Sequence, residues 1–96
     1  MMFILSLNFT DQGARGLKDA PKRAQAAGEL AKKVGAEIKQ VYLTTGDSDL
    51  VAMVEAPSGE SMVKFAMALS MQGNVHTRTA RAWPAAEFHK LVAELP

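Results

Sequence analysis

Apolar and β-branched residues gather in four short stretches of the chain. The first, Met2–Phe9, is a continuous apolar run, a pattern typical of a central strand that is covered on both faces. Val41–Thr44 and Leu50–Val54 are rich in β-branched and aromatic residues, and Gly, Asp and Ser lie between them. The fourth stretch runs from Val75 to Trp83. These patterns predict four β-strands.

The second and third strands are predicted to form a hairpin within Glu37–Ala56, because the intervening Thr-Gly-Asp-Ser sequence is typical of a turn. A turn centred on Gly46, which tolerates a positive φ, and Asp47 places Leu43 opposite Leu50. Side chains alternate between faces along a strand, so one face carries only apolar residues: Val41, Leu43, Leu50, Ala52 and Val54. The other face is mixed and carries Ile38, Gln40, Tyr42, Val51, Met53 and Glu55. A slip of one residue would exchange the two faces.

Two helical pieces are expected between the first and second strands. Thr10 is a good N-cap for a short first piece. A break is expected near Asp19, followed by a helix with Pro21 in its first turn that runs to Val34 and stops at Gly35. The stripe of this helix that faces the sheet is mostly alanine, which predicts close packing: Ala20, Ala24, Ala27, Leu30, Ala31 and Val34.

A further helix begins at the N-cap Ser58 and ends at Gly73. Its sheet-facing residues are expected to be Met62, Phe65, Ala66 and Leu69. A second apolar side, expected to contact the terminal helix or another dimer, carries Val63, Met67 and Met71. Pro84 then starts an amphipathic terminal helix whose apolar side carries Phe88, Leu91, Val92 and Leu95.

The predicted order of elements is βαββαβ followed by a terminal helix. Right-handed crossovers give a four-stranded antiparallel sheet in the order 4-1-3-2, with two helices on one face. The sequence therefore predicts an α+β, ferredoxin-like fold in a single domain over residues 1–96. Because no helix covers the mixed face, we expect a homodimer formed through it.

Four segments together resemble the GYD-domain family. These are Phe9–Gly13, Lys18–Arg23, Tyr42–Val51 and Gly73–Val75. The resemblance spans nearly the whole chain. It implies the ferredoxin-like fold and a dimeric, α+β-barrel-type assembly, but it names no reaction. The chain keeps Gly46 and Asp49 of the family's Gly-Tyr-Asp signature, whereas Ser48 stands where that tyrosine is expected.

Composition is that of an ordinary globular protein, with 48% hydrophobic and 22% charged residues. A net charge of +1 gives no strong attraction to nucleic acid or to a membrane surface, so neither is expected as a partner. The short apolar start lacks the features of a signal peptide. The chain has no cysteine, which excludes thiol catalysis and is compatible with the cytoplasmic location that we expect.

Other motifs predict little chemistry. Thr10–Gly16 follows a strand and opens a helix, as a phosphate-binding loop does, but it matches neither glycine-rich motif. A capped helix start is the favoured interpretation. His76 and His89 are the only histidines and have no further ligands nearby in the sequence, so no metal or other cofactor is expected.

The fourth strand supplies the candidate site. Thr77, Thr79, Arg81 and Trp83 share one parity, and small alanines occupy the other parity, which suits the side beneath the helices. The first four residues are therefore placed on the mixed face with Asn8 and Tyr42. They form either an apolar pocket with a few polar groups, where Arg81 would hold a small acidic ligand, or hydrogen bonds of the dimer interface.

Two classes of function remain. The first is a homo-oligomeric binding or regulatory module for a small molecule. The alternative is a cofactor-independent enzyme, similar to the dimeric α+β-barrel monooxygenases or isomerases, that uses Asn8, Tyr42, Arg81 and Trp83. The absence of an evident acid–base pair favours the first.

Overall fold

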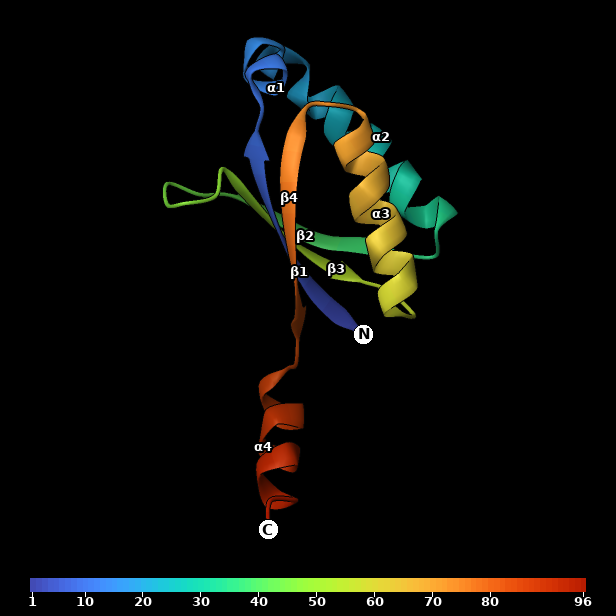
Figure 1. The fold of residues 1–96 in the computed structure, drawn as a ribbon, viewed down its shortest axis with the longest axis vertical. Coiled ribbons are helices and arrows are strands. Elements are labelled where there is room, and N and C mark those ends of the chain that lie inside the picture. Colours follow the sequence, from blue (N-terminus) through green and yellow to red (C-terminus); the bar gives the residue numbers. More distant parts are fainter.

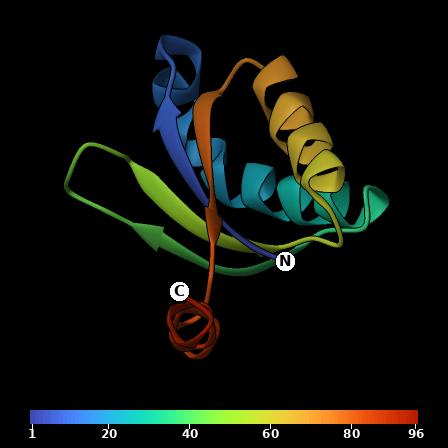
Figure 2. The same cartoon turned by 60° about the horizontal axis from the view of Figure 1, so that its bottom comes forward.

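Strands and helices follow one another in the predicted order in the computed structural model, which describes residues 1–96 (Figure 1). The strands are β1 (Met2–Phe9), β2 (Glu37–Leu43), β3 (Leu50–Glu55) and β4 (Val75–Ala82). The helices are α1 (Asp11–Arg15), the 3-10 turn η1 (Leu17–Asp19), α2 (Ala20–Lys33), α3 (Gly59–Met71) and α4 (Ala85–Ala93). The sheet is antiparallel, in the order β2-β3-β1-β4. Helices α2 and α3 cover one face, so the α+β, ferredoxin-like prediction is confirmed (Figure 2).

The ends of the helices follow from their capping residues. Thr10 precedes α1, and its hydroxyl accepts a hydrogen bond from the Gly13 amide at 3.0 Å. Ser58 caps α3 in the same way through the Ser61 amide at 3.1 Å. The only positive φ angles, both +81°, belong to Gly35 after α2 and Gly73 after α3, where the chain must turn back toward the sheet.

The hairpin register is confirmed, with one exception at the start of β2. Leu43 lies opposite Leu50 and Gln40 lies opposite Met53, as expected. A bulge at Lys39 then places Ile38 opposite Val54, on the face that the helices cover. The prediction that Ile38 lies on the open face was therefore wrong, because the extra residue of a bulge reverses the alternation beyond it.

The predicted faces of β4 were also wrong. Its pairing with β1 sets Phe3 opposite Arg81, and Leu5 opposite Thr79. Phe3 and Leu5 belong to the core, so Arg81 and Thr79 share the helix side and Ala80 lies on the open side. Residue size misled the prediction because β4 is an edge strand, where Thr79 stays exposed even on the helix side.

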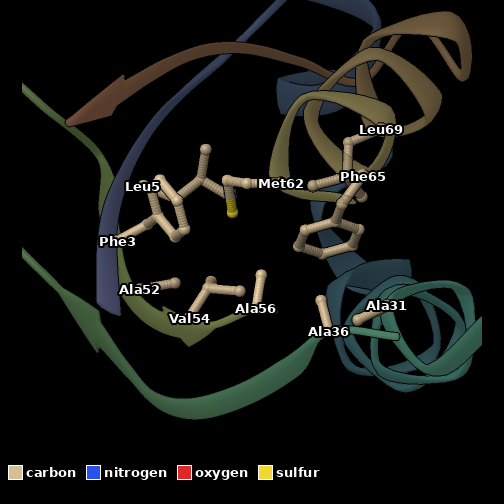
Figure 3. Close-up of a cluster of buried hydrophobic side chains, with 10 residues drawn as sticks. All are labelled: Phe3, Leu5, Ala31, Ala36, Ala52, Val54, Ala56, Met62, Phe65 and Leu69. Carbon is tan, nitrogen blue, oxygen red and sulfur yellow. The ribbon is translucent and has the colours of Figure 1, made fainter. Parts of the chain in front are cut away.

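The core lies between the sheet and the two long helices (Figure 3). Its ten buried residues are Phe3, Leu5, Ala31, Ala36, Ala52, Val54, Ala56, Met62, Phe65 and Leu69. Full burial of a large apolar side chain stabilises the fold by roughly 1.5–3 kcal/mol. Helix α3 supplies three large side chains, Met62, Phe65 and Leu69, whereas α2 contributes only Ala31. Most of the buried apolar surface that the helices contribute to the core therefore belongs to α3.

Helix α4 stands clear of the rest of the chain, beyond the end of β4 (Figures 1 and 2). About half or more of each apolar side chain on its apolar side is exposed: Phe88 56%, Leu91 50%, Val92 48% and Leu95 68%. It does not cover the second apolar side of α3 within the same chain, where Met67 and Met71 are exposed. None of the helices combines the length and the apolar composition that crossing a membrane requires.

Candidate functional site

A cavity of about 120 Å³ lies between α2, α3 and the helix side of the sheet. Thirteen of its sixteen lining residues are hydrophobic, which makes it an apolar chamber. On α2 the lining consists of Ala20, Ala24 and Ala27, together with Arg23. Methyl side chains are too short to fill the gap above the sheet. The prediction of close packing along the whole alanine stripe was therefore wrong, and only Ala31 is fully buried.

The polar lining residues of the cavity gather at one end. They are Arg23 from α2, Gln72 at the end of α3 and Asn74 before β4. Arg23 is half-buried, donates a hydrogen bond from Nη2 to the Gly13 carbonyl at 3.1 Å, and forms no ion pair. The guanidinium has five N–H donors, so most of its donors remain for another partner. The cavity thus combines an apolar body with one cationic end.

A set of hydrogen bonds fixes this polar end by tying the start of α1 to the turn between α3 and β4. The Thr10 amide donates to Asn74 O at 3.1 Å, and its hydroxyl donates to Gly73 O at 2.6 Å. Gln12 Nε2 donates to both Gln72 O and Asn74 Oδ1, at 3.1 and 3.0 Å. Gly13 is buried against Asn74. Thr10–Gly16 is therefore a capped helix start, in which the Gly13 amide already donates its hydrogen bond to the hydroxyl of Thr10.

The hairpin end is anchored to β1 by a second set of contacts. Asp49 Oδ2 accepts a hydrogen bond from the Phe9 amide at 2.8 Å, and the Asp49 amide donates to Leu7 O at 2.9 Å. Asn8 Nδ2 donates to Asp47 O at 2.8 Å. The carboxylate of Asp49 continues the pairing of β3 with β1 past the last ladder pair, which is Leu7–Leu50. Gly46 has no positive φ, so the turn does not require glycine for that reason.

The structure divides five of the six residues of the predicted site between the two faces of the sheet, and Trp83 follows the end of β4. Asn8 and Tyr42 lie on the open face, where the Tyr42 hydroxyl donates to Gln40 Oε1 at 2.8 Å. Thr77, Thr79 and Arg81 lie opposite Leu7, Leu5 and Phe3, on the helix side. None of the six lines the cavity. The prediction that they gather on one face was wrong, because it depended on the reversed parity of β4.

Arg81 contacts aromatic rings rather than a carboxylate. Its guanidinium carbon lies 4.5 Å from the centroid of the Trp83 ring and 5.8 Å from that of Phe3, and Nη1 donates to Ala82 O at 2.6 Å. Stacking on a ring is a common use of arginine. Trp83 itself is 52% exposed. This arrangement fixes the end of β4 where the chain turns toward α4.

Charged side chains of the open face lie at the start of β2 and on β4, where Arg78 lies opposite Ser6 and donates a hydrogen bond to Ser48 Oγ at 3.3 Å. Lys39, on the bulge, pairs with Glu37 at 3.2 Å and with Glu55 at 3.6 Å. The hydrogen bond and the charge of Glu37, with a smaller effect of Glu55, raise the pKa of Lys39 above its usual 10.5. No group of three histidine or carboxylate side chains lies close enough to hold a metal ion.

Sequence reasoning missed the cavity, although one signal for it was present. Arg23 lies within the alanine stripe, three residues after Ala20 and four before Ala27. A charged residue inside a stripe of very small side chains indicates a space beneath the helix with a polar entrance.

Comparisons with known proteins agree with this fold. A family model described as the GYD domain matches residues 3–92. Among solved structures, the crystal structure of TTHA0845 from Thermus thermophilus is similar, with a TM-score of 0.52 and 26% sequence identity. The alignment covers 86% of this chain and 96% of that chain. The search of the curated proteins finds no match.

Proposed function

The chain belongs to the GYD-domain family, and from this premise we propose that it is a homo-oligomeric module that binds a small molecule in the cavity beneath α2. The observation that carries this proposal is the apolar chamber with Arg23 at its polar end. Binding sites for small molecules commonly combine an apolar lining with a few polar groups that orient the ligand. The proposed ligand is accordingly small and apolar, with one acidic end.

The size of the cavity limits the ligand. An engineered apolar cavity of about 150 Å³ in another protein binds benzene. A chamber of about 120 Å³ therefore suits a body near the size of one six-membered ring. A carboxylate at one end would meet Arg23, whose planar guanidinium can donate two parallel hydrogen bonds to it.

The proposed assembly uses the open face of the sheet. Ile4, Val51 and Met53 are half-buried there and no helix covers them. A second copy would bury them further, each with a gain of up to roughly 1.5–3 kcal/mol. Two sheets packed on these faces would form the dimeric, α+β-barrel-type assembly that the family resemblance implies.

We expect sodium benzoate to raise the melting temperature of the protein, and benzyl alcohol, its uncharged counterpart, to raise it less. At 100 times the dissociation constant, binding stabilises by about 2.7 kcal/mol, or about 10 °C or more in a domain of this size. Ala24→Leu should fill the cavity and abolish the shift, and Arg23→Met should remove the preference for benzoate.

Ala26→Leu is the matched control, because Ala26 is exposed on the same helix and does not line the cavity. It should leave the shift unchanged. Binding in the cavity would be contradicted if both leucine variants behaved alike, or if neither benzoate nor short-chain carboxylic acids stabilised the wild-type protein.

The alternative function, a cofactor-independent enzyme, has no specific support. Its four proposed residues do not share one face of the sheet. Asn8 and Tyr42 lie on the open face, whereas Arg81 lies on the helix side and Trp83 follows the end of β4. The lining of the cavity includes neither a histidine nor a carboxylate that would act as a general base.

A further inference from the structure

Strand β2 is an edge strand that its own chain leaves almost uncovered. Only Ile38 among its seven residues is even half-buried. Val41 lines the cavity and yet is 53% exposed, and Leu43, which follows it on the same side, is 79% exposed. The exposed side chain of Val41 indicates that the cavity is open along this edge. An open apolar edge of this kind is usually covered in the functional form of a protein.

Helix α4, in turn, has an apolar side that contacts no sheet or helix of its own chain. It has nine residues, and isolated helices shorter than about 12–15 residues are only marginally stable in water. It stands clear of its own domain in both views (Figures 1 and 2). Its apolar side, centred on Phe88 and Leu91, needs a partner to keep the helix formed.

We propose that α4 of each copy docks on the β2 edge of the other copy, over Val41 and Leu43, and closes the mouth of the cavity. The binding site would then be complete only in the dimer. This inference rests on the proposed dimer through the open sheet face. The occupant of the β2 edge is thus a second copy of this chain, and the exchange is reciprocal.

Geometry favours this partner. The hairpin and α4 are the two parts that extend beyond the body of the domain, and they leave it in different directions (Figures 1 and 2). The sheet order leaves β2 and β4 as the two edges. When two such sheets pack face to face with strands crossing near 90°, a diagonal two-fold axis carries β4 of one copy across the hairpin end of the other. Helix α4 follows β4 directly and so reaches that edge.

The size of the surfaces also indicates a second copy rather than an unrelated protein. A standard interface buries about 800 Å² on each partner. Phe88 and Trp83 could bury about 150–250 Å² each if fully covered, and both are already half-covered. The α4 surface alone is thus too small for a stable complex. It is therefore expected to act together with a larger surface, and the open sheet face of the same chain provides one.

Cross-linking between single-cysteine variants tests this proposal without background, since the chain has no cysteine of its own. Leu43→Cys protein is mixed with Leu91→Cys protein, subunits are allowed to exchange, and a short bismaleimide is added. We expect a covalent heterodimer. Lys90→Cys, on the opposite side of α4, is the control for Leu91→Cys. Thr79→Cys, exposed on the helix side of the opposite edge strand β4, is the control for Leu43→Cys. Both control mixtures should link at most one tenth as fast.

The outcomes separate this inference from the proposed function. If sedimentation shows a dimer but Leu43→Cys and Leu91→Cys do not link, the exchange of α4 is wrong and the sheet-face dimer stands. Equal linking by the controls would also overturn the docking on Val41 and Leu43. A monomer at micromolar concentration would reject the dimer and the exchange together, whereas benzoate binding to the cavity is measured independently by the thermal shift.

Discussion

At the scale of single residues, Gly13 is the position of the family segment Phe9–Gly13 for which the structure gives the clearest reason for the residue type. A Cβ built on this residue would collide with the backbone oxygen of Asn74. We predict that Gly13→Ala destabilises the protein by about 1–3 kcal/mol, because one backbone must move away from the other. Urea denaturation measures the change. The control is Gly28→Ala within α2, where no atom lies within 4 Å, and which should stabilise by about 0.5–1 kcal/mol.

Asp49 provides a second prediction at this scale. Its carboxylate accepts the Phe9 amide hydrogen bond in a half-buried position. Asp49→Ala should lower the free energy of unfolding by about 1.5–3 kcal/mol, the usual contribution of a hydrogen bond to a charged group. It should also speed exchange of the Phe9 amide hydrogen. Asp47→Ala, in the same loop, should have little effect, since only the backbone oxygen of Asp47 takes part in a hydrogen bond. Equal losses from both variants would contradict this role of Asp49.

At the scale of elements, the sequence predicted the order and pairing of the strands but not every face. Strong local signals, such as the caps Thr10 and Ser58 and the turn between Leu43 and Leu50, predicted the elements well. The face of Ile38 depended on the bulge at Lys39, which has no clear sequence signal. The face of β4 depended on its pairing with β1, and the sizes of its own residues do not encode that pairing.

The candidate site was harder to predict than the fold for the same reason. A cavity remains wherever two elements are farther apart than the side chains between them can fill. The alanines of α2 are compatible with two arrangements. Either the helix packs directly on the sheet, or it stays farther away and leaves a cavity, as it does here. Bulky residues of α3, such as Phe65, fill the core, whereas the N-terminal half of α2 presents only small side chains and Arg23 to the cavity. Such a balance between distant residues is not visible in one helix alone.

At the scale of the whole molecule, the open sheet face is the surface on which the proposed assembly depends. Met53 lies near its centre, opposite Ile4 on β1 and Gln40 on β2. We predict that Met53→Lys raises the dissociation constant of the dimer at least about tenfold, equivalent to about 1.4 kcal/mol. The physical reason is that an unpaired ammonium group would have to leave water on association. Sedimentation equilibrium over a range of concentrations measures this change.

Met67→Lys provides the comparison, because the same change is made on the outer side of α3, where Met67 is 55% exposed and far from the open face. It should leave the dimer intact and reduce only assemblies larger than a dimer. If Met67→Lys dissociated the dimer while Met53→Lys did not, the second copy would pack on α3 instead of the sheet. The cavity would then remain open along β2, and α4 would need a different partner from the one proposed above.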